Sequence, residues 1–241
     1  MTELRGWPPA LVAPPGTPAG GAGWALRQEG AMTRKRHSQV EFVASLEAKQ
    51  IPAYPPVGSS RYGWQDYASI LDEPAWEAKQ VARKVGMFSI VDRHWTRVLA
   101  EWIGPRRVLE VMAGAGWLAK AMIEHGVAWL ATDNGSWQPW PAVAPVLELS
   151  AREAVRRFGP DSEILVCSWP PYKGRTFADA CRRWGPDKPI VYIGESEGGC
   201  TANDTFFHHF VLMKEPPTIP LMAWKGLHDE VQIGFWREGV Q

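Results

Sequence analysis

The stretch RVLEVMAGAGW, residues 107–117, decides the fold of this chain. Residues 108–111 are mostly apolar, which is typical of a short buried strand. Gly114 and Gly116 interrupt the apolar run, and residues 118–123 then follow a helical pattern. The stretch therefore predicts a strand, a tight glycine turn and a helix.

This glycine turn has a chemical use. Glycine lets the backbone approach a ligand closely, and the start of a helix presents unpaired N–H groups beside it. A second apolar run, residues 127–132, ends at Asp133. An acid about twenty residues beyond such a turn is placed to accept hydrogen bonds from ribose hydroxyls. A purely structural turn is the alternative, but Asp133 favours a nucleoside site.

Strand and helix patterns alternate from residue 107 to about residue 194. The further strand patterns are 146–149, 163–167 and 190–194. This alternation predicts a parallel sheet with helices on both faces and a ligand crevice at the carboxyl ends of the strands. The polar residues at such ends are Glu110, Asp133, Ser150, Ser168 and Glu195. Two final strand patterns, 210–213 and 230–236, are joined only by loop, so we expect them to pair antiparallel.

The composition predicts one main domain with an extension, because 241 residues with 45% hydrophobic content can bury a sizeable core. We expect a flexible Pro/Gly-rich tail at residues 1–36, an N-terminal helical extension or lid at 37–104 and the main domain at 105–241. The aromatic cluster RYGWQDY, residues 61–67, is a candidate lid, although the pattern favours aromatic contacts that dock the N-terminal helices.

Charge and cysteine content narrow the partners and the location. The 26 basic residues balance 26 acidic ones, which counts against binding to duplex DNA. The three cysteines lack metal-ligand spacing and form no even set, so we expect a reducing, cytoplasmic setting and no metal. No apolar run approaches the roughly 20 residues that span a bilayer, so no membrane association is expected.

These patterns together resemble the class I S-adenosylmethionine-dependent methyltransferases over residues 105 to 238. EVMAGAG, residues 110–116, looks like the first motif of that family, in the acid-x-x-Ala-Gly-x-Gly form of the amino-methyltransferases. The resemblance implies a Rossmann-like α/β fold whose seven-stranded sheet has five parallel strands plus a terminal antiparallel hairpin. It also implies S-adenosylmethionine as the cofactor. The implied cofactor contacts are Glu110, Ala113, Gly114, Gly116, Asp133, Asn134, Ser150 and Ala151.

The segment SWPPY after the fourth strand carries the expected catalytic residues: Ser168, Trp169, Pro170, Pro171 and Tyr172. It is similar to the Asp/Asn/Ser-Pro-Pro-Tyr motif of enzymes that methylate exocyclic amino groups. It departs from that motif because Trp169 separates the serine from the prolines. A strand terminator with a core tryptophan is the structural alternative.

The chemistry of an amino group explains such a motif. A planar amino nitrogen is a poor nucleophile because its lone pair is delocalised, and acceptors for its two N–H bonds can localise and aim that pair. Ser168 and the carbonyl of Trp169 or Pro170 are candidate acceptors. Tyr172 or Trp169 is the candidate stacking ring.

Glu195, at the end of the fifth strand pattern, is the other candidate for chemistry. A carboxylate there suits a general base or a group that binds a substrate amine, and a solvated loop acid is an equal alternative.

The sequence therefore predicts an S-adenosylmethionine-dependent methyltransferase. The expected acceptor is the nitrogen of a nucleobase amino group or of an amino-bearing small molecule. A methyltransferase-like binding domain without catalysis is the alternative, which the tryptophan inside the proline motif keeps open. A nicotinamide-dependent oxidoreductase fits less well, because Met112 stands where the dinucleotide pattern has glycine.

Overall fold

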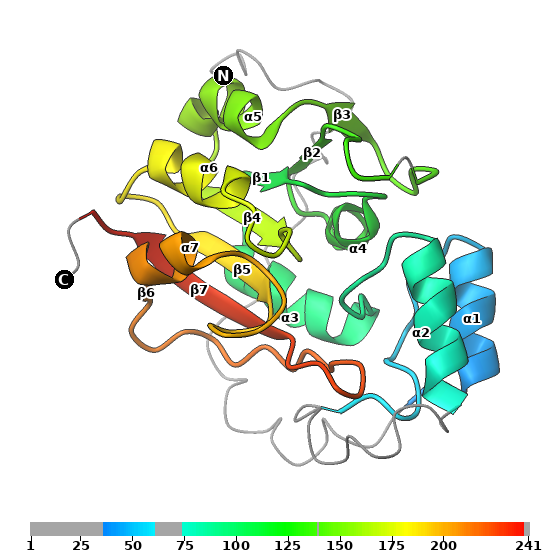
Figure 1. Cartoon of the computed structure of the whole chain (residues 1–241). Coiled ribbons are helices and arrows are strands. Elements are labelled where there is room, and N and C mark those ends of the chain that lie inside the picture. Colours follow the sequence, from blue (N-terminus) through cyan, green and yellow to red (C-terminus); the bar gives the residue numbers. More distant parts are fainter. Residues whose placement is uncertain (1–35, 61–73, 139, 239–241) are drawn as a thin grey trace.

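A seven-stranded sheet forms the centre of the computed structural model, which describes residues 36–60, 74–138 and 140–238 (Figure 1). The strands are β1 (Val108–Val111), β2 (Trp129–Asp133), β3 (Val146–Glu148), β4 (Ile164–Ser168), β5 (Ile190–Gly194), β6 (Phe210–Leu212) and β7 (Glu230–Trp236). Their order across the sheet is β3-β2-β1-β4-β5-β7-β6. The predicted tail falls almost wholly outside the described residues, as does the RYGWQDY cluster.

The strand directions confirm the predicted fold. β1 pairs in parallel with β2 and β4, and the parallel pairing continues to β3 on one side and β5 on the other. β7 runs antiparallel between β5 and β6. The sheet therefore has five parallel strands and a terminal antiparallel hairpin, as the resemblance to class I methyltransferases implies.

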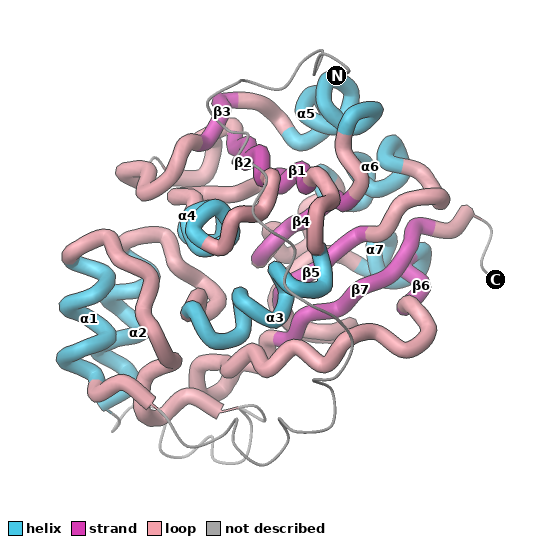
Figure 2. Tube along the Cα trace, turned by 180° about the vertical axis from the view of Figure 1, so that it is seen from behind, coloured by secondary structure: helices cyan, strands magenta, loops and turns pink. Residues whose placement is uncertain are grey.

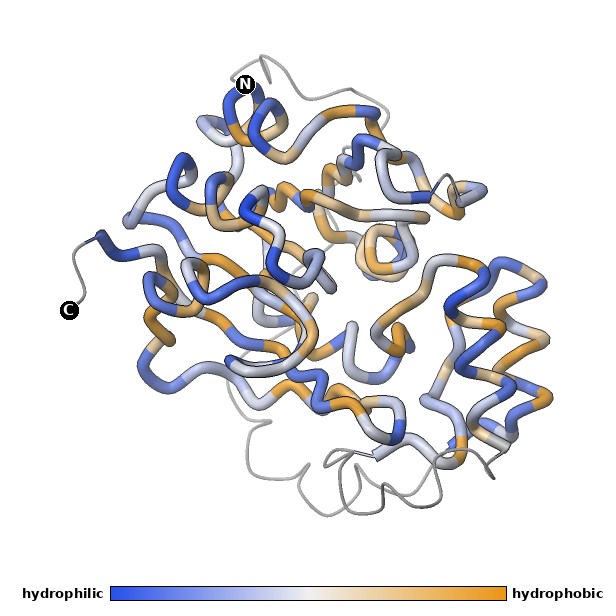
Figure 3. Tube along the Cα trace, viewed as in Figure 1, coloured by the Kyte–Doolittle hydropathy of each residue, from blue (hydrophilic) through white to orange (hydrophobic). Residues whose placement is uncertain are grey.

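Helices cover both faces of the sheet (Figure 2). They are α1 (Gln39–Glu47), α2 (Pro74–Lys84), α3 (Arg93–Ile103), α4 (Trp117–Glu124), α5 (Ala151–Phe158), α6 (Thr176–Trp184) and α7 (Asp204–His209), with a 3-10 turn at Gly159–Asp161. One apolar cluster joins α3 and α4 to one face, and another joins α5, α6 and α7 to the opposite face. Both clusters use alternate residues of the strands, which is why the central strands are mostly apolar (Figure 3).

The helix starts follow local sequence signals. Ser38 and Glu41 form a capping box at α1, and Asp92 accepts the N–H groups of His94 and Trp95 at the start of α3. α7 was not predicted, because it has only six residues and follows a glycine-rich loop.

The N-terminal helices share a core with the sheet. Phe42 of α1 packs edge-on against Trp224, with ring centroids 5.7 Å apart, and Ser60 forms a β-bridge with Ala223. Phe42 and Trp224 belong to the same apolar cluster as α3 and α4. The division at residue 104 remains a prediction. None of the helices in the described part of the chain has the length and apolar character needed to cross a bilayer.

Two tryptophan indoles attach the segment between α2 and α3 to the rest of the chain. Trp117 donates from Nε1 to the carbonyl of Val85 at 2.8 Å, and Trp224 donates to the carbonyl of Phe88 at 2.9 Å. These bonds hold the segment over the carboxyl ends of the strands, where it reaches the candidate site.

Candidate functional site

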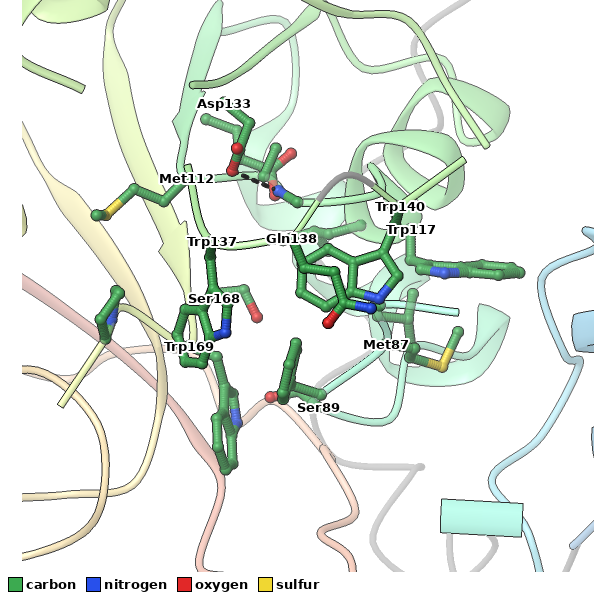
Figure 4. A pocket seen from close by; sticks show the side chains of 18 of the residues that line it. Met87, Ser89, Met112, Trp117, Asp133, Trp137, Gln138, Trp140, Ser168 and Trp169 are labelled. Carbon is green, nitrogen blue, oxygen red and sulfur yellow. Dashed lines mark hydrogen bonds between the residues drawn. The ribbon is translucent and has the colours of Figure 1, made fainter. Parts of the chain in front are cut away.

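A pocket opens at the carboxyl ends of β1, β2 and β4 (Figure 4). Three segments beyond the strand ends complete its walls: the glycine turn after β1, the loop after β2 and the segment between α2 and α3. The lining residues predicted from sequence are Glu110, Ala113, Gly114, Asp133, Asn134, Ser168, Trp169 and Pro171. The crevice expected at the strand ends is therefore present and joins both predicted motifs.

Asp133 is fixed at the end of β2 by two backbone donors. The N–H of Gly114 donates to Oδ2 at 2.8 Å, and the N–H of Gly135 donates to Oδ1 at 2.7 Å. The first bond ties β2 to the glycine turn after β1. The carboxylate thus has a set orientation at the pocket wall, with acceptor capacity beyond these two bonds.

Glu110 is buried beneath the glycine turn, with 1% of its surface exposed. Burial raises its pKa from 4.5 to about 8, against the opposing effect of a hydrogen bond from Trp129 Nε1. That bond is 2.7 Å long and ends on Oε2. Glu110 also lines the pocket, so it offers a carboxyl group that a cationic ligand would convert to the ionised form.

The turn after β1 contains three residues with left-handed backbone: Met112, Gly114 and Gly116. Gly116 lies outside the pocket lining. A Cβ on Gly116 would come within 2.9 Å of Val146 Cγ2, so this glycine allows the turn to pack on β3. Its role in the structure is a packing role.

Ser150 and Ala151 lie at the start of α5, away from the pocket lining. Ser150 Oγ accepts the N–H of Glu153 at 3.3 Å and caps the helix. Asp133 accepts the backbone N–H of Leu149 on its carbonyl at 3.0 Å, which links the end of β3 to the end of β2.

Trp169 adopts a left-handed backbone conformation, with φ of +54°, immediately after β4. Its Nε1 donates to Asp229 Oδ1 at 2.9 Å, and its ring stacks on Phe88 with centroids 5.6 Å apart. Its backbone N–H donates to the carbonyl of Ile193 at 2.8 Å. The extra residue in the proline motif therefore has a fixed position at the pocket wall.

The rest of the motif divides between the pocket and the surface. Pro170 is outside the lining, and its carbonyl accepts the N–H of Ala202 at 3.0 Å. Tyr172 is 56% exposed, and Lys173 Nζ lies 5.0 Å from its ring centroid. Of the two candidate stacking rings, Trp169 lines the pocket and Tyr172 does not.

Glu195 is buried, with 5% of its surface exposed, and does not line the pocket. Its Oε2 accepts the N–H of Cys200 at 2.6 Å, and its Oε1 accepts the N–H of His228 at 3.2 Å. Burial alone would raise the pKa of Glu195, but these hydrogen bonds outweigh it and lower the pKa. The carboxylate organises the loop after β5.

Several pocket residues carried no sequence signal. Phe88 and Ser89 lie between α2 and α3, and Trp137, Gln138 and Trp140 follow β2 in a connection that sequence analysis left irregular. The aromatic residues among them, Phe88, Trp137 and Trp140, were the one sequence feature that could have indicated a binding site.

Asp229, just before β7, was missed as well. It is 4% exposed, and burial raises the pKa of its carboxyl to about 7, while Ser89 and Trp169 lower it. The Ser89 hydroxyl thus lies near Asp229. Even so, Ser89 Oγ and Asp229 Oδ2 lack a partner with hydrogen-bond geometry among the described residues.

No protein-family model matches the chain, and no curated protein matches it. Solved structures do match, at low identity. The 1,6-didemethyltoxoflavin-N1-methyltransferase of Burkholderia thailandensis, with S-adenosylhomocysteine bound, is 16% identical over 71% of this chain and 89% of that chain, with a TM-score of 0.39. The mitomycin 7-O-methyltransferase MmcR is 12% identical over 81% and 66%, with a TM-score of 0.38. The CurJ carbon methyltransferase is 10% identical over 59% and 54%, with a TM-score of 0.37.

Proposed function

We propose that this chain is an S-adenosylmethionine-dependent methyltransferase that acts on the nitrogen of a nucleobase amino group or of an amino-bearing small molecule. One observation carries the proposal: a single pocket joins the carboxylate of Asp133, tied to the glycine turn, to Ser168 and Trp169 of the proline motif. A nucleoside-type cofactor and an amino acceptor would thus share one chamber.

The residues of the pocket fit the chemistry of the cofactor. Asp133 would accept hydrogen bonds from the ribose hydroxyls, and Glu110 would face the ammonium group of the methionine part. The aromatic ring of Trp140, in the pocket lining, offers a face that attracts a sulfonium cation. Glu110 and Asp133 are also the only ionisable side chains of the described lining. Asp133 supplies a carboxylate, and Glu110, whose pKa is raised to about 8, would ionise beside a cationic group of the ligand.

When bound, the cofactor supplies an electrophilic methyl group on a positively charged sulfur. The chain's part is to hold the amino nitrogen and to exclude water. Ser168 Oγ and the Trp169 carbonyl make no hydrogen bond to any described residue, whereas the Pro170 carbonyl is engaged by Ala202. Ser168 and Trp169 would therefore accept the two N–H bonds of the amino group and aim its lone pair.

Isothermal titration of the full chain with S-adenosylmethionine and, separately, with NADH tests the proposal. We expect saturable binding of S-adenosylmethionine, weakened about tenfold or more in Asp133→Ala, because a charged acceptor of two hydroxyls is lost. Asp133→Asn keeps one acceptor oxygen, so its affinity for S-adenosylmethionine should lie between that of wild type and that of Asp133→Ala. Asp187→Ala, at an exposed acid remote from the pocket, is the matched control.

Failure of the folded protein to bind S-adenosylmethionine, with no ligand retained from expression, would contradict the proposal. Cofactor binding without methyl transfer to any nucleoside or amine would favour the binding domain without catalysis. Preference for NADH would favour the oxidoreductase.

A further inference from the structure

The wall of the pocket opposite Asp133 holds polar atoms that the described residues leave without partners. Ser89 Oγ and Trp140 Nε1 are both buried and lack a hydrogen-bond partner among the described residues. Ser89 is only 2% exposed and lines the pocket. Buried polar atoms are costly unless they are paired, so these two are placed for a ligand that supplies the missing bonds.

Three side chains converge on the same open space in Figure 4: Ser89, Gln138 and Ser168. They come from the α2–α3 segment, the loop after β2 and the end of β4. Serine hydroxyls and the glutamine carbonyl accept hydrogen bonds, while the glutamine amide and the Trp140 N–H donate them. The wall therefore offers acceptors and donors within one small region.

Aromatic rings surround these polar groups. Phe88 lies at the centre of the cluster and contacts Trp169, Trp140 and Trp137 at centroid distances of 5.6, 5.6 and 6.0 Å. All four rings line the pocket. Such flat apolar faces favour a planar ligand over a branched or flexible one.

The ionisable residues that line the pocket indicate which planar ligands it can bind. No Lys, Arg or His lines the pocket within the described part of the chain, and its two ionisable lining groups, Glu110 and Asp133, are acids. A phosphate or carboxylate on the acceptor would lack a cationic partner and would be repelled by the Asp133 carboxylate.

We infer that Ser89, Gln138 and Trp140 form an acceptor subsite for an uncharged heteroaromatic ring that carries the amino group. This inference rests on the proposed function, because the ring is the methyl acceptor of that reaction. Ring nitrogens and carbonyls accept from Trp140 and Gln138, and a ring N–H or hydroxyl group donates to Ser89. A hydrocarbon ring would leave the polar groups of Ser89, Gln138 and Trp140 without hydrogen bonds. A nucleotide would bring a phosphate for which the pocket has no cationic partner.

Asp229 is a positioning residue for this subsite. Its Oδ1 holds the indole of Trp169, and its carboxyl lies beside Ser89. It therefore fixes one stacking ring and lies next to one of the acceptors.

Titration of the full chain with adenosine and with cytidine, each in the presence and absence of S-adenosylmethionine, tests the inference. The corresponding 5′-monophosphates and cyclohexylamine serve as charged and non-aromatic comparisons. We expect at least one nucleoside to bind saturably, about tenfold or more tightly than its monophosphate and than cyclohexylamine. Ser89→Ala should weaken nucleoside binding by about tenfold, the size of a lost hydrogen bond at a buried site, and leave S-adenosylmethionine affinity unchanged.

Two further variants keep the test decisive. Gln138→Leu changes an exposed position and should also weaken nucleoside binding, whereas Ser45→Ala on α1, outside the pocket lining, should not. Asp229→Asn preserves an acceptor for Trp169 and should retain most of the affinity for the nucleoside. Asp229→Ala removes that acceptor and should lose most of this affinity.

Equal or tighter binding of a monophosphate, equal binding of cyclohexylamine, no saturable binding of either nucleoside, or no effect of Ser89→Ala and Gln138→Leu would overturn the inference. Failure of S-adenosylmethionine to bind, with nucleoside binding intact and sensitive to Ser89→Ala, would overturn the proposed function and leave the ring subsite standing.

Discussion

The carboxylate of Asp133 accepts a 2.8 Å hydrogen bond from the backbone N–H of Gly114, so the ends of two neighbouring strands are held by one side chain. Gly135 donates to the other carboxylate oxygen. We expect Asp133→Ala to lower the free energy of unfolding by about 1–3 kcal/mol, because two backbone donors lose a charged partner. Urea denaturation monitored by tryptophan fluorescence measures the loss. Asp133→Asn should cost less, and an Ala variant as stable as wild type would show that water replaces the carboxylate.

The two glycines that flank α4 separate backbone strain from crowding. Gly116 and Gly126 have nearly equal positive φ angles, +81° and +80°. A Cβ on Gly116 would meet Val146 at 2.9 Å, whereas a Cβ on Gly126 has nothing within 4 Å. We expect Gly126→Ala to destabilise the fold by about 1 kcal/mol and Gly116→Ala by about 1–3 kcal/mol more. Thermal unfolding of both variants tests this. Equal losses of stability in the two variants would mean that β3 moves to accommodate the added Cβ without a loss of stability.

Three buried carboxyl groups should make stability depend on pH. Burial raises the pKa of Glu110 from 4.5 to about 8, and those of Asp92 and Asp229 from 3.8 to about 7. Between the ordinary and the raised pKa, the folded chain holds protons that the unfolded chain has released. The contribution of these three groups to stability is then fully present below about pH 4, declines as pH rises to about 8, and levels off above that.

Glu110→Gln isolates the largest contribution. The amide oxygen keeps the bond from Trp129 but cannot titrate, so the decline between pH 5 and pH 8 should be shallower than in wild type. Glu197→Gln, at an exposed acid, should follow the wild-type slope. Urea denaturation across this pH range is the measurement, and parallel slopes for wild type and Glu110→Gln would refute the assignment.

The carboxylate of Glu195 should stabilise the loop after β5. Its carboxylate accepts the N–H groups of Cys200 and His228, so Glu195→Ala should speed hydrogen exchange at those two amides by about tenfold or more. Exposed Glu197→Ala on the same loop is the matched control and should leave both rates unchanged. Unaltered exchange in Glu195→Ala would show that backbone contacts alone hold the loop.

The strands and the glycine turn were predictable because their signals are local. Residues 108–111 are apolar except for Glu110, and Gly114 and Gly116 stand where left-handed backbone is required. Asp133 follows from its spacing beyond the turn, and the structure places it in contact with Gly114.

The acceptor wall could not be predicted, because contacts between distant residues create it. Phe88 reaches the pocket through the Trp224 indole, which holds its carbonyl from 136 residues away. Asp229 meets Trp169 across 60 residues of sequence. Glu195 is buried because its loop folds back so that Cys200 and His228 donate to it, which a polar, glycine-rich sequence does not reveal.

The backbone bonds between the loops after β4 and β5 bear on the kinetics of ligand entry. Trp169 N–H binds Ile193, Ala202 N–H binds Pro170, and Lys173 N–H binds Ala202. Two loops joined in this way open together or not at all. A ligand that enters between these two loops would therefore require both of them to move together.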